Sequence, residues 1–426
     1  MKLNTMKKLL LLLIVPFLSF GQIDQEIYNF MNKENIPSIS ASIVKNGEII
    51  WMKSYGYADL SNQIEADNNT VYMLASCSKT ITATALMQLY EQGLFQLDDP
   101  INNYLPFSVF NPNYETDITF RMLLTHTSSI RDNWNNMPYS IDDGFIGDYP
   151  ITLEEYLSNY LTPSGNLYNS NQNFYNNEPG VTYKYSNIAV AVIGYLVEII
   201  SQNSFDEYCE ESIFNPMCMN SCNWFFDQYP DPSIIAIPYE DNVTPSNHYG
   251  YADFPSGQLR SNIIDISNFL IMYLNQGTFN GNVILSNETI NMMHSIQFGN
   301  DQGLIWYIEN FDGDDVWAHN GGDLGVSTDI FFSLENNIGV AVLSNGESYL
   351  DDINDIIYNY AKSLDGSVEN YPDCSEPLIQ EEIVNNYQNK NLLNKIDILG
   401  RESNTNKGLQ LHIYDDGSVE KKYLIK

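Results

Sequence analysis

Ser76 and Lys79 lie three positions apart at the start of a long apolar segment, and this pair could supply a nucleophile and its base. On a helix, residues three apart share one face, with about 5–6 Å between their Cβ atoms. Serine becomes nucleophilic when a base takes its proton, and a desolvated lysine can do so near neutral pH. The helix N-terminus would add N–H groups and a positive dipole end for an oxyanion.

The S-x-x-K pattern occurs three times, so the sequence context has to select one copy. The copy at 42–45 lies in a strand-like run, where residues three apart point to opposite faces. The copy at 418–421 follows a turn signal in the polar tail. Only Ser76 precedes a clear helix pattern, over residues 80–92, with Gly93 placed to end it.

Composition limits the classes of partner. The chain has 426 residues, 43% of them apolar, which is enough for one large domain or two ordinary ones. The formal net charge of −35 argues against nucleic acid and against an anionic membrane surface as partners. It fits a soluble acidic surface.

Residues 1–21 have the pattern of a signal peptide. Lysines come first, and the apolar run that follows, over residues 9–20, is too short to span a bilayer. Ser19-Phe20-Gly21 resembles a cleavage site, and nothing later has the pattern of a transmembrane helix. We therefore expect a periplasmic, secreted or cell-surface protein.

The five cysteines are an odd number for an exported protein, so at least one lacks an intramolecular partner. One disulfide among Cys209, Cys218 and Cys222 is an open alternative. Cys77, beside the nucleophile, is interpreted as a small buried apolar residue. No Cys or His pair has convincing ligand spacing for zinc, and we expect neither a metal nor a cofactor.

Strand patterns occur at both ends of the main segment, with helix patterns between them. The hairpin signal Asn46-Gly47 joins strands at 38–45 and 48–55, and further strands are expected at the positions 316–319, 327–334 and 338–343, followed by a helix at 352–363. The middle is mostly helical, with long surface loops over 131–180. This arrangement predicts an α/β (α+β) fold, an antiparallel sheet of N- and C-terminal strands with a helical subdomain.

We divide the chain into four parts: a signal peptide (1–21), a main domain (22–365), a linker (366–390) and a small C-terminal segment (391–426). The last segment is polar, with strand-like pieces such as Leu409–Tyr414. It resembles the short sorting-type segments found at the C-terminus of some exported bacterial proteins. The alternative is a small strand pair that packs on the main domain.

Four segments together carry a family resemblance. They are LASCSKTITATALMQLYEQGLFQLDDPINNYLP around Ser76, ITFRMLLTHTSSI (118–130), PGVTYKYSNIAVAVIGYLVEIIS (179–201) and SGQLRSNIIDISNFL (256–270). Over about residues 25 to 363 the chain resembles the serine β-lactamase and penicillin-binding-protein superfamily. The similar branch contains class C β-lactamases, D-stereospecific peptidases and esterases, and it implies a β-lactamase/transpeptidase-like fold.

The resemblance implies a second motif, Y-x-N, which Tyr185-Ser186-Asn187 fits. It follows the turn Pro179-Gly180 and precedes an apolar helix pattern, whereas the other Y-x-N triplets, at Tyr175, Tyr273 and Tyr387, lack this context. A phenol beside a lysine ammonium can have a lowered pKa and act as a base. Asn187 can donate to a substrate carbonyl and accept from Lys79.

The third motif of the family is usually K-T-G, and here it has the form His319-Asn320-Gly321, followed by Gly322. The glycines would let a substrate backbone approach closely. The resemblance implies an oxyanion hole formed by the N–H groups of Ser76 and Gly322. His319 would bind or polarise the substrate, and as a cation it could hold a carboxylate. This H-x-G form resembles D-peptidases and some esterases and lowers the expectation of β-lactamase activity.

Other residues are given local roles. His248-Tyr249-Gly250 is a second H-x-G in a loop and is set aside. His126 is expected to bond within Thr125-His126-Thr127, and Ser129 stands where the family usually has glycine. No G-x-S-x-G occurs, which disfavours a Ser/His/Asp hydrolase of the α/β type.

The expected function is an exported serine hydrolase that forms an acyl-enzyme on Ser76 and acts on D-amino-acid peptides, amides or esters. Lys79 and Tyr185 would share the proton transfers. A class C-like β-lactamase is the alternative within the family. An alternative of another class is a non-catalytic, envelope-associated binding protein that keeps the fold.

Overall fold

The computed structural model describes residues 21–364, 392–396, 408–414 and 419–424. The chain divides into two compact units, residues 1–371 and 372–426. The predicted signal peptide lies outside the described residues except for its last residue, Gly21, and so does most of the predicted linker.

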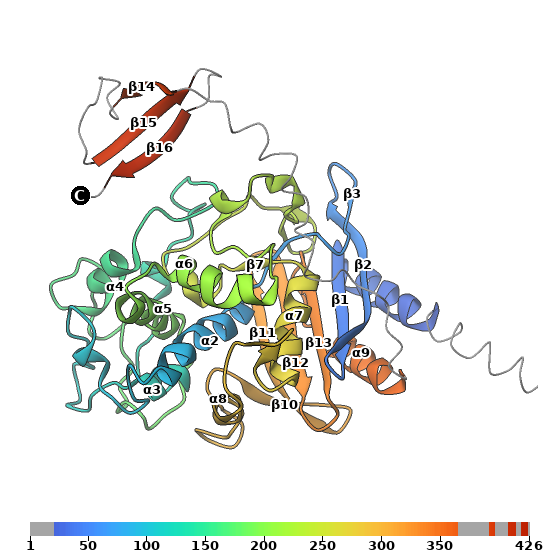
Figure 1. Cartoon of the computed structure of the whole chain (residues 1–426), viewed down its shortest axis with the longest axis horizontal. Coiled ribbons are helices and arrows are strands. Elements are labelled where there is room, and N and C mark those ends of the chain that lie inside the picture. The colour runs from blue at the N-terminus through green and yellow to red at the C-terminus, as the bar shows by residue number, and fades with distance from the viewer. Residues whose placement is uncertain (1–20, 365–391, 397–407, 415–418, 425–426) are drawn as a thin grey trace, which may run out of the picture. The chain divides into compact units, whose positions relative to one another are not determined.

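A seven-stranded antiparallel sheet forms the centre of the first unit. In spatial order its strands are β10 (Tyr307–Phe311), β11 (Asp314–Asp323), β12 (Val326–Ser333), β13 (Ile338–Ser344), β1 (Ser38–Lys45), β2 (Glu48–Asp59) and β3 (Ile64–Glu65). Figure 1 shows the N-terminal strands, in blue, beside the C-terminal ones, in orange. The predicted fold class is therefore confirmed.

The β1–β2 hairpin forms where the sequence predicts it. Asn46 and Gly47 have φ angles of 55° and 80°, the left-handed pair that a type I′ turn requires. β1 then pairs on its other side with β13, with Ile39 opposite Ser344. This pairing joins N-terminal and C-terminal strands, about 300 residues apart, into one sheet.

The two faces of β1 differ in chemistry. Ile39, Ala41 and Ile43 belong to an apolar core that also contains residues of α9 (Asp351–Ser363) and of the N-terminal helix at 21–34. On the opposite face the Ser42 hydroxyl contacts the Ser267 hydroxyl of α7 (Ile263–Leu274) at 2.8 Å. Side chains alternate along a strand, so the sheet is covered by helices on both faces.

The remaining helices lie between β4 and β10 in the sequence. They are α2 (Ser78–Glu91), α3 (Phe120–Leu124), α4 (Leu153–Leu161), α5 (Asn187–Ser201), α6 (Phe205–Cys209) and α8 (Asn287–Met293). The short strands pair as β4 (Tyr72–Met73) with β7 (Arg260–Ser261), β5 (Tyr239–Glu240) with β6 (Thr244–Pro245), and β8 (Thr278–Phe279) with β9 (Asn282–Val283). In Figure 1, α2 to α6 form the helical region beside the sheet.

The segment 131–180 is more ordered than predicted, because it contains helix α4. The Thr152 side chain caps this helix by accepting from the Glu155 N–H, and the helix buries Tyr156 and Tyr160. Asn173, also fully buried, donates to the Tyr160 carbonyl at 2.8 Å. The segment is therefore part of the packed helical region, and it reaches the nucleophile.

The second unit forms its own three-stranded antiparallel sheet in the order β14 (Leu392–Ile396), β15 (Gly408–Tyr414) and β16 (Val419–Leu424). The strand predicted at Leu409–Tyr414 corresponds to β15. Within the described ranges, no single helix has the length and apolar character to cross a membrane, although the bent pair Asn187–Ser201 and Phe205–Met217 meets that criterion jointly.

Candidate active site

The candidate nucleophile lies on a tight turn just before helix α2. Residues Ala75–Cys77 form a 3-10 turn, and the α-helix begins at Ser78, so Ser76 precedes the helix that was predicted to carry it. Ala75 has φ +45°, a left-handed conformation that is costly for a residue with a Cβ. The β4–β7 pair fixes this turn, since the Leu74 N–H donates to the Leu259 carbonyl.

Two predicted residues, Lys79 and Tyr185, meet at the Ser76 hydroxyl. Lys79 Nζ lies 2.9 Å from Ser76 Oγ, and the Tyr185 hydroxyl lies 2.9 Å from the same atom. Tyr185 comes from the segment before α5, 109 residues further along the chain. The other S-x-x-K copy in the described residues separates as expected, with Ser42 contacting α7 and Lys45 donating to the carbonyls of Ala361 and Leu364.

Lys79 is fully buried, and its surroundings suit it to act as a base. Its Nζ also donates to the Ser256 carbonyl at 2.5 Å. Burial lowers the pKa of Lys79 to about 8, although the nearby carboxylates of Asp132, Asp253 and Asp323 act in the opposite direction. The free amine is therefore accessible near pH 8, where it can take the Ser76 proton.

Tyr185 differs from the expectation. Burial raises the pKa of its phenol well above the usual value, even though the hydrogen bond to Ser76 acts to lower it. Tyr185 therefore stays protonated and donates to Ser76 Oγ. The prediction of a lowered phenol pKa is wrong, because desolvation outweighs the hydrogen bond to Ser76.

Asn187 is the first residue of α5, and Asp132 holds it in place. Asp132 accepts from the Asn187 backbone N–H and side-chain Nδ2, both at 2.9 Å, and also from the Ile188 N–H and the Ser186 hydroxyl. The expected bond from Lys79 to Asn187 is replaced by the bonds from Lys79 to Ser76 and Ser256. With Nδ2 facing Asp132, the Asn187 amide oxygen is available to accept an N–H from a substrate.

The two glycines of the third motif have different roles. A Cβ at Gly321 would lie 2.5 Å from the Leu74 carbonyl oxygen and 3.0 Å from the Ser76 nitrogen, so this glycine allows β11 to pack against the nucleophile turn. A Cβ at Gly322 would meet nothing within 4 Å, and Gly322 lines the cavity at Ser76. Only Gly322 thus has the open surroundings expected for approach of a substrate backbone.

His319 is buried, with 2% of its surface exposed, and it is not among the residues that line the cavity. Its Nδ1 lies 2.7 Å from the Asn320 carbonyl oxygen, so Nδ1 carries the proton. Burial and the nearby Lys79 lower the pKa of His319 to about 3. His319 is therefore neutral at physiological pH, which argues against the hypothesis that it holds a carboxylate as a cation.

His126 forms contacts outside the segment Thr125-His126-Thr127. The hydroxyls of Thr125 and Thr127 contact each other at 2.9 Å, whereas His126 Nδ1 accepts from the Ser186 N–H at 3.3 Å. Its ring lies against the Tyr185 ring, with centroids 4.4 Å apart. The His126 ring thus packs against the Tyr185 ring, and the prediction of local bonding is wrong.

Ser129 adopts the conformation that the family's glycine would take with ease. Its φ is +61°, in the left-handed region. The Ser129 hydroxyl accepts from Asn111 Nδ2 at 2.8 Å. This bond helps to hold the turn without a glycine.

The cavity at Ser76 has a volume of about 50 Å³. Its walls come from five parts of the chain, and its lining residues are Ser76, Trp134, Met137, Tyr139, Asn187, Tyr251, Asp253, Ser256, Gly322 and Asp323. Sequence reasoning missed Asp132, Asp253 and Asp323. The available signal for Asp132 was its position directly after the segment 118–130, at the start of a region interpreted as surface loops.

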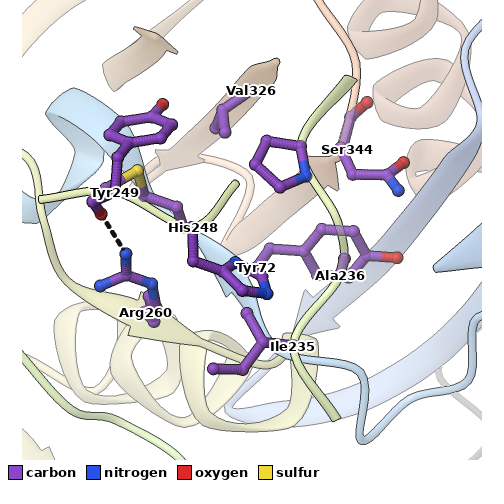
Figure 2. A pocket seen from close by; sticks show the side chains of 11 residues that line it. Tyr72, Ile235, Ala236, His248, Tyr249, Arg260, Val326 and Ser344 are labelled. Carbon is purple, nitrogen blue, oxygen red and sulfur yellow. Dashed lines mark hydrogen bonds between the residues drawn. The ribbon is translucent and has the colours of Figure 1, made fainter. Parts of the chain in front are cut away.

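The second H-x-G sequence lies elsewhere. Figure 2 shows His248 and Tyr249 lining a separate cavity, together with Tyr72 and Arg260. The volume of this cavity is about 10 Å³. Arg260 is buried and donates to the Tyr249 carbonyl. Ser76 does not line this cavity, which agrees with setting this triplet aside.

Cys209 and Cys222 are buried free thiols, so neither forms a disulfide with the other or with Cys218. The disulfide considered among these three cysteines is therefore absent from the described structure. Cys77 is also buried, its Sγ lies 3.1 Å from the His319 carbonyl oxygen, and burial raises its pKa. Its interpretation as a small buried residue agrees with these surroundings.

Comparison with known proteins adds independent evidence. A family model described as Beta-lactamase matches residues 23–363. Protein flp of Staphylococcus aureus (strain N315) is 25% identical over 340 residues, which cover 76% of this chain and 62% of that protein. The chain thus spans less than two thirds of the length of this curated relative.

Solved structures show the same fold. An octameric penicillin-binding protein homologue from Pyrococcus abyssi has a TM-score of 0.64 at 22% identity, covering 96% of this chain and 88% of that one. The D-amino acid amidase of Ochrobactrum anthropi SV3 has a TM-score of 0.65 at 18% identity, covering 80% of this chain and 98% of that one. With the family match over residues 23–363, the chain belongs to the Beta-lactamase family, within the superfamily of serine β-lactamases and penicillin-binding proteins.

Proposed function

We propose that this protein is a serine hydrolase that forms an acyl-enzyme on Ser76 and acts on D-amino-acid peptides, amides or esters. One observation carries the proposal: Ser76 Oγ lies 2.9 Å from both Lys79 Nζ and the Tyr185 hydroxyl. The two neighbours differ in acidity, because burial lowers the pKa of the lysine to about 8 and keeps the tyrosine protonated. A base and an acid thus face the same oxygen.

Acylation follows from this geometry. Lys79, as the free amine, takes the Ser76 proton while Oγ attacks the substrate carbonyl carbon. The N–H groups of Ser76 and Gly322 stabilise the oxyanion. When the intermediate collapses, Tyr185 gives its proton to the leaving amine or alcohol, and the Lys79 ammonium returns a proton to the tyrosine. Water repeats the attack in deacylation, with Lys79 again as the base.

The substrate class is supported by the family and by the H-x-G form of the third motif. The structural relative from Ochrobactrum anthropi is a D-amino acid amidase, described in complex with L-phenylalanine. A class C-like β-lactamase is the second candidate, favoured by the family description. A neutral His319 in place of the usual lysine makes that activity the weaker candidate.

The test is labelling followed by turnover. After incubation with a fluorophosphonate, mass spectrometry of the intact protein and its peptides should place one adduct on Ser76, and Ser76→Ala should prevent it. D-alanyl peptides, D-amino-acid amides, p-nitrophenyl esters and nitrocefin then rank the activities. An active Ser76→Ala protein would refute the proposal. No adduct and no turnover would favour the non-catalytic binding role.

We also propose that the protein is exported and works in the periplasm, at the cell surface or outside the cell. The support is the basic and apolar pattern of residues 1–21. N-terminal sequencing of the protein from its native host should find a mature chain that begins at or near Gln22. A chain that retains Met1 and stays in the cytoplasmic fraction would contradict this proposal.

A further inference from the structure

The cavity at Ser76 has two carboxyl groups on its walls, and burial raises the pKa of Asp253 to about 6 and also raises the pKa of Asp323. Asp253 and Asp323 line it, and none of its described lining residues is a lysine, arginine or histidine. Lys79 is not among the lining residues; it is fully buried, and its Nζ donates to Ser76 and Ser256. A substrate carboxylate would therefore meet like charge on these walls.

Asp253 is a buried carboxyl group on the cavity wall. The residue is 4% exposed, and its Oδ2 accepts from the Ser256 hydroxyl at 2.8 Å. The backbone N–H of Asp253 also forms a hydrogen bond with this carboxylate. A buried carboxylate oxygen that faces a cavity is stabilised when an N–H donor reaches it, and most strongly when the donor is charged.

Asp323, the last residue of β11, also lines the cavity. Its Oδ1 accepts from the Tyr139 hydroxyl and from the Leu324 N–H, both at 2.8 Å. These bonds hold the carboxylate in place. Trp134, which is 63% exposed, and Tyr251 also line the cavity, and aromatic faces attract cations.

The negative charge continues outwards from the cavity. Gly322 and Asp323 also line a neighbouring groove of about 590 Å³. The other acidic residues of that groove are Glu34, Glu347, Asp351 and Asp352. Its one lysine, Lys33, pairs with Glu34 at 3.0 Å and with Asp352 at 3.4 Å. A positively charged ligand would thus be attracted along the groove to Ser76.

We propose that this site selects substrates with a protonated amine close to the scissile acyl group, bound between Asp253 and Asp323. The inference rests on the proposed hydrolase function and names its substrate class as amino-acid amides, esters and peptides with a free amino terminus. The amine has to be close to the acyl carbon, because the two aspartates and Ser76 line one cavity of only about 50 Å³. Acyl groups with a free carboxylate at that position are rejected.

An alternative role for Asp253 and Asp323 is to change the basicity of Lys79 without touching the substrate, since both raise the pKa of Lys79. The two roles differ in what they predict. A change in the pKa of Lys79 alters the acylation rate of every substrate to a similar extent. Recognition of the amine changes only substrates that carry it, so the ratio between a free amine and its acetylated form separates the two roles.

The experiment compares three p-nitroanilides of D-alanine, with the amino group free, N-acetylated or N-succinylated, at pH 7.5. Wild-type kcat/KM should be at least tenfold higher for the free amine than for the acetylated compound, and lowest for the succinylated one. Asp253→Asn and Asp323→Asn should each lower the free-to-acetylated ratio at least fivefold. Asp315→Asn, an exposed residue at the other end of β11, is the matched control and should leave the ratio unchanged.

Fluorophosphonate labelling of Ser76 accompanies each assay and separates the outcomes. Labelling with equal kcat/KM for the free and acetylated compounds, or with no turnover of the free amine, would overturn the amine inference and leave the nucleophile assignment intact. A wild-type preference that both aspartate variants keep would overturn the assignment of Asp253 and Asp323. A wild-type protein without an adduct would overturn the proposed function and this inference together.

Discussion

The Asp132 carboxylate accepts hydrogen bonds from both the backbone N–H and the side-chain Nδ2 of Asn187, each at 2.9 Å. It also accepts from the Ile188 N–H, so one side chain caps helix α5 and fixes the rotamer of its first residue. An acidic group at a helix N-terminus is stabilising. Asp132 is thus a positioning residue that couples the start of α5 to the cavity.

Removal of Asp132 should reduce turnover more than it reduces the reactivity of the nucleophile. Asp132→Ala should lower kcat/KM by about 10–100-fold, because Asn187 would lose its orientation. It should also cost about 1–2 kcal/mol of unfolding free energy through the lost cap. Asp132→Asn should restore part of the turnover. Ser76 labelling by a fluorophosphonate should slow by much less, because Ser76 and Lys79 remain in contact.

The control for this prediction is Asp142→Ala, an exposed change within the same segment of the chain. Both kinetics and urea denaturation should match the wild type for that variant. If Asp132→Ala lowered labelling and turnover equally, its effect would lie in the nucleophile turn, and the positioning role through Asn187 would be refuted.

The pH dependence of kcat/KM should follow the ionisation of Lys79. Its pKa is lowered to about 8, and the free amine is the active form, so kcat/KM for an N-acetylated substrate should rise through about pH 8. At pH 7 about a tenth of the lysine is the free amine. Asp253→Asn removes a carboxylate that raises this pKa, so it should move the rising limb to lower pH. A limb that moved to higher pH, or that stayed near pH 10 in the wild type, would exclude Lys79 as the base.

Local sequence patterns predicted the parts of the structure that local physics determines. The Asn46-Gly47 hairpin, the strands on either side of it and the helix after Ser76 depend on residues close together in the chain. Motif order then placed Ser76, Lys79 and Tyr185 in one site, although Tyr185 is 109 residues from Ser76. These three side chains do meet.

The remaining features of the site depend on tertiary contacts, which the spacing of residues in the sequence does not reveal. Asp132 and Asp253 lie far apart in sequence, and only the fold brings both close to Lys79. The pKa directions of Tyr185 and His319 follow from burial, and a single sequence gives no measure of the burial of an individual side chain. This is why the sequence suggests a base at Tyr185 and leaves open whether His319 acts as a cation.

Gly321 and Gly322 are adjacent glycines with different surroundings. Their alanine variants test the packing of β11 against the nucleophile turn. Gly321→Ala would place a Cβ 2.5 Å from the Leu74 carbonyl oxygen and into contact with the Thr328 hydroxyl, so the turn at Ser76 has to move. We expect a loss of about 1–3 kcal/mol of stability and at least a 100-fold loss of kcat/KM. Kinetics and thermal unfolding of both alanine variants make the measurement.

Gly322→Ala is the control, since its Cβ meets nothing within 4 Å. Its stability should stay within about 0.5 kcal/mol of the wild type. Its KM should rise, because the added methyl group projects into space that the substrate uses. Equal losses of stability in the two variants would contradict the assigned difference between the glycines.

His319 should not titrate in the physiological range. Its pKa is lowered to about 3, so a matched pair of acid and ester substrates should give parallel kcat/KM profiles between about pH 5.5 and 8.5, the range in which an unperturbed histidine loses its charge. His319→Lys would place an ammonium in a site that is 2% exposed and close to Lys79, and we expect it to destabilise the fold by several kcal/mol. His319→Gln keeps a polar neutral side chain and should be the milder change. Profiles that diverge as the pH rises, with the acid substrate losing activity first, would show that His319 is charged in the complex. That result would restore its role as a carboxylate-binding cation.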